Sequence, residues 1–448
     1  MGIRTHVTRC STAVVMAAAL AGVAAADCGG GCGSSLSGTP ADEFVAARMG
    51  LLREWVVQIP FDSARTDLKH VVVGDGLVVA QTGDGGVHAV QAAAFSAATA
   101  PRPAAPANGT LRWSRHVGPA GSHYGPATPP GVGPRLVTVA RDRELFAVDR
   151  DTGAARWQTP LATLAAAGAV EIGDWAYAPL QGGGIRRLTF DPYQPTAKTT
   201  ADKPVAAKRS KGGKKKVVEA VKPTPESLRP RSFDGGGRVD RPVRALQQGV
   251  FWTTTDGVLV SLQPTDLEWV RLEFDLNAPA VDTPIARGAA VFAATTAADL
   301  ARVDLVETGV RGLRTGWHVV LDAVPDAGPF LSGETVVVSL GDSGLAAFSA
   351  ETGAALWRSP TAGRVLAVAG DRVWIIDRTE RLAGLDLATG VRRERLCLGG
   401  FSFPVVNAES DRLILASPDG LLVSLAPQTP AAAVPEPAQP AAPAPRQP

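Results

Sequence analysis

His and Cys, two residue types that often perform catalysis or bind metal ions, number only six and four in this chain of 448 residues, and they are scattered. Beyond the first 26 residues no two His stand at the spacing of metal ligands, and no Cys lies near a His in a metal-site pattern. The His of this part of the chain are His70, His88, His116, His123 and His318. We therefore predict no catalytic, metal-binding or cofactor-binding residues and interpret these His as ordinary surface or structural positions.

One segment, Gly341-Asp-Ser-Gly344, resembles the segment around a serine protease nucleophile. Such a motif needs His and Asp partners in a recognisable context, and none is found. Asp-Gly pairs begin similar segments at Asp256 and Asp419. We therefore interpret Gly341-Asp-Ser-Gly344 as a tight turn, in which Asp bonds to the backbone and does no acid–base chemistry.

The elements that carry these residues repeat along the chain. Residues 142–157 and 342–357 align without a gap and share Asp, Thr-Gly and Trp at the same positions, and residues 379–390 form a shorter copy. Partial copies bring the number to eight, at a spacing of about 40 residues once two insertions are removed. Each copy has the pattern of short strands joined by tight turns. A single copy of this size cannot bury both faces of its sheet alone. The sequence predicts an all-β, eight-bladed β-propeller with four-stranded antiparallel blades.

Aromatic and Gly positions support this repeat. Eight of the nine Trp fall on two strands of the copies, where buried aromatic rings would pack one blade against the next. Those expected on the strand after the second turn are Trp113, Trp157, Trp269, Trp317 and Trp357. Those expected on the strand before the first turn are Trp175, Trp252 and Trp374. The second turn needs a permissive residue, and Gly153, Gly353 and Gly390 supply it.

The ninth Trp, Trp55, lies in a strand-like segment with no preceding partner, whereas the last copy, ending at Leu425, lacks its final strand. We therefore predict that residues 54–59 complete the last blade and close the ring, which removes an exposed sheet edge.

The pattern Asp-x-x-Leu-x-Ala-x-Asp-x-x-Thr-Gly-x-x-x-Trp resembles the repeat of the pyrroloquinoline-quinone (PQQ)-like propeller family, over roughly residues 50–426. Glu394 stands where the repeat would have its Trp. That family includes quinoprotein dehydrogenases and BamB-like envelope proteins, and the WD40-like propellers share the architecture. The dehydrogenases carry adjacent Cys, a stacking Trp and calcium ligands. This sequence has no Cys-Cys pair, and no residue can be matched to the calcium ligands, so the resemblance favours the non-enzymatic branch.

The termini read differently from the repeats. Residues 1–26 are predicted to be an export signal, with Arg4 and Arg9 before an apolar run and an A-x-A site. Residues 27–50 are expected to be a Gly/Ala-rich tail, residues 51–426 the propeller, and residues 427–448 a disordered Ala/Pro-rich tail. Cys28 stands where a bacterial lipoprotein is acylated, but Asp27 precedes it where a small residue is needed. A lipid anchor, a disulfide with Cys32 and an unmodified tail all stay open.

Residues 196–231 form an insertion without hydrophobic periodicity, which we expect to be disordered. Its basic residues Lys208, Arg209, Lys211, Lys214, Lys215 and Lys216 give two interpretations: a solvated loop, or a site for an anionic polymer or lipid. It lacks the pattern of a phosphate-binding loop, and we expect no specific nucleic acid partner.

The function that follows is a monomeric, exported and non-catalytic propeller that binds another envelope protein through loops between blades, in the periplasm or at the outer membrane, or secreted. A BamB-like role in outer-membrane protein assembly is the specific form that the resemblance implies. The Gly/Pro-rich segment of residues 118–134 is the candidate contact loop, and a plain connection is the other interpretation. The alternative function is a PQQ-dependent dehydrogenase.

Overall fold

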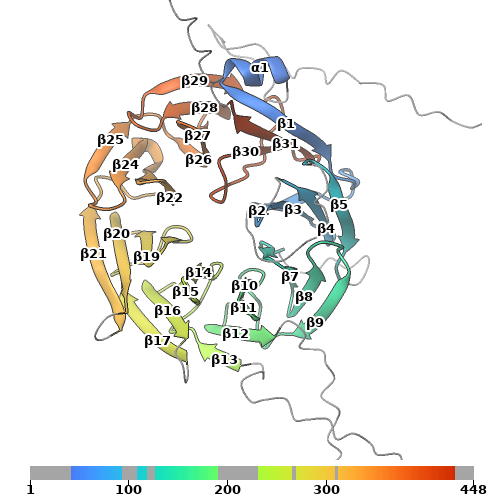
Figure 1. The fold of residues 1–448 in the computed structure, drawn as a ribbon, viewed down its shortest axis with the longest axis vertical. Helices are drawn as coiled ribbons and strands as arrows, with labels where there is room; N and C mark the ends of the chain where they lie inside the picture. Colours follow the sequence, from blue (N-terminus) through green and yellow to red (C-terminus); the bar gives the residue numbers. More distant parts are fainter. Residues whose placement is uncertain are drawn as a thin grey trace, which may run out of the picture. The chain divides into compact units, whose positions relative to one another are not determined.

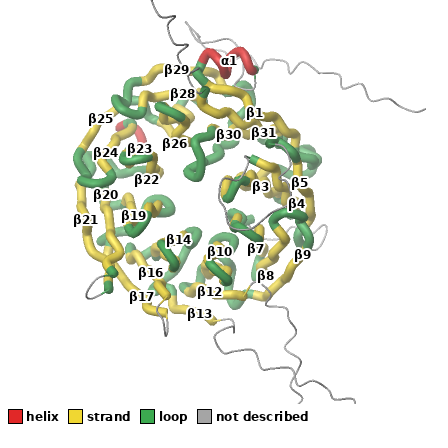
Figure 2. The backbone as a smooth tube through the Cα atoms, in the orientation of Figure 1, coloured by secondary structure: helices red, strands yellow, loops and turns green. Residues whose placement is uncertain are grey.

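The computed structural model describes residues 42–92, 108–118, 127–189, 231–264, 269–307 and 311–428. These residues form a ring of small antiparallel sheets around a central axis (Figure 1). Nearly all of the regular structure is strand, with one short helix outside the ring (Figure 2). The prediction of an eight-bladed β-propeller is confirmed.

Seven blades each contain four strands that follow one another in the sequence. Blade 1 contains β2 (Leu68–Gly74), β3 (Leu77–Thr82), β4 (Gly86–Gln91) and β5 (Leu111–His116). Blade 2 contains β6 (Gly131–Val132), β7 (Leu136–Arg141), β8 (Glu144–Asp149) and β9 (Ala155–Pro160). Blade 3 contains β10 (Val170–Ile172), β11 (Trp175–Leu180), β12 (Gly184–Thr189) and β13 (Arg231–Asp234). Blades 4 and 5 are β14 (Arg244–Leu246), β15 (Gly249–Thr253), β16 (Val258–Pro264), β17 (Trp269–Asp275); β18 (Ile285–Arg287), β19 (Ala290–Ala294), β20 (Asp299–Val306), β21 (Gly312–Val320). Blades 6 and 7 are β22 (Ala327–Ser332), β23 (Thr335–Ser339), β24 (Leu345–Ser349), β25 (Ala355–Ser359); β26 (Gly363–Ala369), β27 (Arg372–Asp377), β28 (Arg381–Asp386), β29 (Arg392–Cys397).

Blade 8 joins the two ends of the ring. It contains β30 (Leu413–Ala416), β31 (Leu421–Pro427) and β1 (Leu51–Gln58), and β1 pairs with β31 along its whole length. The predicted closure by the N-terminal strand is therefore confirmed. The expectation of four strands is wrong for this blade, which has three strands and a single bridge between Phe403 and Ala416. Pro404 follows Phe403 and has no N–H to donate, so the ladder does not extend there.

A short helix precedes the closing strand, in a part of the chain where we expected only a tail. Helix α1 (Glu43–Arg48) begins at Asp42, whose carboxylate accepts a hydrogen bond from the N–H of Phe44 at 2.8 Å. Val45, Ala46 and Met49 are buried against Leu425 and other residues of blades 7 and 8. The helix thus extends the apolar core at the closure.

The core of the protein lies between the blades. The middle strands of a blade are covered by neighbours on both faces, and β3 and β7 are accordingly buried at every position. The outermost strand β9, in contrast, has exposed residues at four of its six positions. The described residues form eight apolar clusters, one at each of the eight junctions between adjacent blades. Burial of apolar surface at every junction is what holds the ring together.

The segment Gly341–Ser343 forms a single 3-10 turn, η2, between β23 and β24. The N–H of Leu340 donates to the main-chain oxygen of Gly344, and Asp342 pairs with the exposed Arg378. The interpretation of this segment as a turn of the sixth blade is confirmed.

Candidate binding sites

Several predicted site residues lie outside the described residues. These are Cys28 and the basic residues Lys208, Arg209, Lys211, Lys214, Lys215 and Lys216. The candidate loop of residues 118–134 is described only at residue 118 and from residue 127 onward.

The outer-strand Trp of one blade contacts a turn of the next. Trp113 on β5 donates from Nε1 to the main-chain oxygen of Arg150 at 2.8 Å. Arg150 belongs to the turn between β8 and β9, which ends at Gly153 with φ +68°. A Cβ at Gly153 would lie 2.7 Å from the Trp113 ring, so only Gly leaves room for the indole. This contact of ring, hydrogen bond and Gly, which we call a Trp dock, fixes blade 2 against blade 1.

The same Trp dock occurs at three further junctions. Trp317 donates to Ala350 O at 3.1 Å and lies against Gly353, and Trp357 donates to Leu387 O at 2.7 Å and lies against Gly390. At the closure, Trp55 donates to Ala92 O at 3.1 Å and lies against Gly109. Four junctions thus share one contact. The spacing of Trp and Gly in the sequence indicated the positions of these residues but not the contact between them.

Asp side chains hold the turns of two of these docks, those of Trp113 and Trp357. The Asp149 carboxylate accepts from the N–H of Asp151 and Thr152 at 3.1 and 2.9 Å. Burial alone would raise the pKa of Asp149, but hydrogen bonds from Arg156 and Thr152 outweigh it, and the pKa is lowered. Asp386 accepts equivalent bonds in blade 7. These Asp are turn residues, as we expected.

Other junctions depart from the repeat. Trp157 is buried at the repeat position, and its Nε1 has no hydrogen-bond partner among the described residues. The connection between β12 and β13, which corresponds to the partner turn of the other docks, lies outside them. The expected equivalence of Trp269 needs correction: it pairs with Pro264, while Leu272 holds the repeat position. Glu394 does occupy the repeat position in blade 7, and Arg372 binds it at 3.2 Å.

Blade 3 contains an aromatic cage that the sequence analysis missed. The Arg187 guanidinium lies 3.8 Å from the ring centre of Trp175 and 5.6 Å from those of Phe233 and Trp269. Arg187 is buried, and burial lowers its pKa. The chain's own cation fills this cage, so it is a structural feature of the junction between blades 3 and 4.

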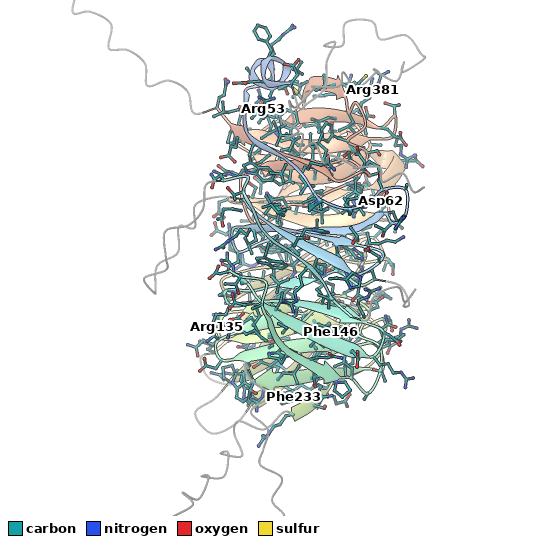
Figure 3. The ribbon with its side chains drawn as sticks, turned by 90° about the vertical axis from the view of Figure 1, so that its right-hand side faces the viewer. Arg53, Asp62, Arg135, Phe146, Phe233 and Arg381 are labelled. Atoms are coloured by element: carbon teal, nitrogen blue, oxygen red, sulfur yellow. The ribbon has the colours of Figure 1, made fainter. Side chains whose placement is uncertain are left out.

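A cavity lies between blades 1 and 2. It has a volume of about 820 Å³, within the range of ligand pockets. Blade 1 contributes the end of β5 and the two residues after it, and blade 2 contributes the β7–β8 turn and the outer strand β9. Phe146 of β8 is part of its lining and packs on the apolar cluster of this junction. In Figure 3 the side of the ring that carries Phe146 faces the viewer. We call this cavity the blade 1–2 cleft.

Cations dominate the rim of the blade 1–2 cleft. Its lining contains four Arg and one His but only two carboxylates, namely Arg115, Arg141, Arg143, Arg156, His116, Asp142 and Glu144. Arg141 is buried and donates to Asp84 O and Val117 O at 2.9 and 3.0 Å, which ties the cleft wall to blade 1. An apolar floor under a cationic rim can hold an anion that also carries an apolar group.

A buried His, His88, lies on the face of blade 1 opposite to the blade 1–2 cleft. His88 is buried on β4, and its Nδ1 lies 2.8 Å from Oγ of Ser114. Burial lowers the pKa of His88 to about 4, so the imidazole is neutral at pH 7. Two other His make separate contacts: His70 contacts Ala127 O, and His318 contacts Asp299.

Two kinds of feature are absent from the described residues. No group of three or more His, Cys, Asp or Glu is placed to hold a metal ion there. No helix in this part of the chain has the length and apolar character needed to cross a membrane.

Comparisons with known proteins give one family. The model of the family described as outer membrane protein assembly factor BamB matches residues 53–195 and 311–432, more than half of the chain. The first matched segment contains the Trp docks of Trp55 and Trp113 together with the blade 1–2 cleft. No curated protein matches the sequence.

Solved structures agree on the fold. BamB from Moraxella catarrhalis is 18% identical with a TM-score of 0.56, and the match covers 83% of this chain and 97% of that one. The computationally designed Ika8 protein is 11% identical with a TM-score of 0.55, covering 83% and 98%. The C-terminal WD40 domain of Sif2 is 9% identical with a TM-score of 0.51, covering 84% and 99%. At such identities the likeness concerns the propeller architecture alone.

Proposed function

The chain belongs to the family of the outer membrane protein assembly factor BamB, and we propose that it is an exported, non-catalytic propeller that binds other proteins of the bacterial cell envelope. In this proposal it assists the assembly of outer-membrane proteins. The single observation that carries the proposal is the family match, which covers both sides of the ring closure.

The structure is compatible with a scaffold. Eight junctions are packed with apolar side chains, and four are fixed by Trp docks, so the ring presents its loops and outer strands on a rigid base. A rigid platform loses little conformational entropy when a partner binds, which favours affinity.

Export and anchoring are part of the same proposal. The signal-like residues 1–26 would direct the chain out of the cytoplasm, and Cys28 would be acylated if the protein is held at a membrane. The Lys-rich insertion of residues 196–231 would add an electrostatic contact to anionic lipid or polymer.

A pull-down from native envelope tests the proposal. Full-length protein is compared with a variant lacking residues 196–230, which leaves β13 intact from Arg231 onward, and captured proteins are identified by mass spectrometry. We expect both to enrich the same outer-membrane assembly proteins, and the full-length chain to retain more anionic material. Capture of no envelope protein would overturn the proposal. So would dye reduction by the purified protein with PQQ, calcium and an alcohol or sugar.

A further inference from the structure

The cations of the blade 1–2 cleft are only partly neutralised. Arg156 pairs with Asp149, with Nε 3.1 Å from Oδ2. Arg115 donates to the main-chain oxygen of Gly153 at 3.0 Å, which satisfies one N–H but leaves its charge. Arg143 is exposed, and its guanidinium has no hydrogen-bond or ion-pair partner among the described residues, although its main-chain oxygen accepts from the N–H of Leu161. Arg115 of blade 1 and Arg143 of blade 2 therefore bring positive charge to the cleft from both of its blades.

With Asp142 and Glu144 of the lining and Asp149, the partner of Arg156, all counted, the four Arg still leave one positive charge in excess. Glu144 accepts a hydrogen bond from Gln158 at 2.9 Å, across the β8–β9 pair. Asp142 is exposed in the β7–β8 turn with φ +53°. It is next to Arg143 in the sequence, but no ion pair joins the two side chains among the described residues. The local charge thus favours an anionic ligand, and each guanidinium group can bind a carboxylate through two hydrogen bonds.

The floor of the cleft is apolar. Phe146 is half-buried and packs with Val148 and Trp113 on the cluster between the blades, so one part of the ring stays accessible from the cavity. A volume of about 820 Å³ exceeds what a single ion needs and suits several residues of a peptide.

We propose that the blade 1–2 cleft binds a short acidic segment of a partner protein, with carboxylates at Arg115 and Arg143 and an apolar side chain on Phe146. This inference rests on the proposed function, because it takes the ligand to be a protein. The acidic segment would recognise the cleft by charge and be held by burial of its apolar group.

Peptide binding to the purified full-length protein tests this inference. The probe is a fluorescein-labelled peptide of alternating Glu and Phe, measured by fluorescence anisotropy beside the same peptide with Gln for Glu. The double variant Arg115→Glu/Arg143→Glu is compared with Arg392→Glu, which replaces another exposed Arg, on β29 of blade 7. We expect the double variant to bind at least ~10-fold more weakly and Arg392→Glu to stay within ~2-fold, in line with the loss of charge-assisted contacts. Equal binding of the Glu and Gln peptides, or of wild type and double variant, would overturn the inference.

A measurement on the wild-type protein guards against misfolded variants. Phenylglyoxal modifies accessible Arg, and peptide mapping reports each site. The Glu-Phe peptide is expected to protect Arg115 and Arg143 and leave Arg392 reactive, whereas protection by anionic lipid vesicles but not by the peptide would overturn the inference.

The envelope pull-down, repeated with the double variant, separates the two proposals. If wild type captures assembly proteins and the double variant captures them equally, the scaffold function stands and the cleft assignment fails. If wild type captures none, the scaffold function itself fails.

Discussion

A Cβ at Gly153 of blade 2 would lie only 2.7 Å from the indole ring of Trp113 in blade 1. The two residues are far apart in the sequence, yet each restricts which residue can occupy the other position. The ring fills the space that Gly leaves, and its Nε1 satisfies Arg150 O. Each Trp dock therefore couples the turn of one blade to the packing of the one before it.

Replacing Gly153 with Ala is expected to destabilise the protein by about 2–4 kcal/mol. The left-handed backbone costs Ala about 1 kcal/mol, and overpacking against the Trp113 ring adds about 1–3 kcal/mol. Gly173→Ala is the matched control, because Gly173 also has positive φ but nothing lies within 4 Å of its Cβ position. Urea unfolding compares the two, and equal losses would contradict the Trp dock.

Glu54→Gln is expected to weaken the ring closure. The Glu54 carboxylate accepts from Nε and Nη2 of Arg412 at 2.8 and 3.0 Å, and its side chain is only 15% exposed. Loss of this two-point pair should cost about 1–3 kcal/mol and speed amide exchange in β1. Glu334→Gln, whose partner Arg287 lies at 3.0 Å but whose side chain is 73% exposed, should cost less than about 0.5 kcal/mol. Unchanged exchange in β1 would argue against closure by this pair.

His88 should make stability depend on pH. Its pKa is about 4 in the folded protein, below the value of 6.5 for a free His, so between these values the unfolded chain binds the proton and the native state does not. The free energy of unfolding should therefore fall as pH drops from about 6.5 to 4, by up to about 1.4 kcal/mol per pH unit. His88→Asn should remove this part of the slope while keeping an acceptor for Ser114. Parallel pH profiles of wild type and variant would show that His88 is not responsible.

Arg141→Met should destabilise the protein by about 1–3 kcal/mol, because the oxygens of Asp84 and Val117 lose their donor inside the structure. Arg143→Met, two residues away on the exposed turn, should change stability by less than about 0.5 kcal/mol. Thermal unfolding measures both. A similar loss in both variants would mean that the cleft wall is not held by Arg141.

The sequence was informative where structure depends on near neighbours. The turn Asp149, Thr152 and Gly153 is built from side-chain bonds within five residues, so its copies could be recognised and counted. The closure by β1 followed from the missing final strand of the last copy. Trp269 was misplaced because a Trp on the correct strand does not reveal its register, and register is decided by pairing with Pro264 across the sheet.

The sequence by itself determined the number of blades, the closure of the ring and the likeness to one propeller family, because alternating apolar residues and turn residues act over a few positions. Only the tertiary structure decided which side chains meet. Arg115 and Arg143 share a cleft, Arg187 fills a cage of three aromatic rings, and the pKa of His88 is lowered, each because packing of separate strands sets distance and exposure to water. The family follows from the repeats, but the proposed binding site exists only where two blades are packed together.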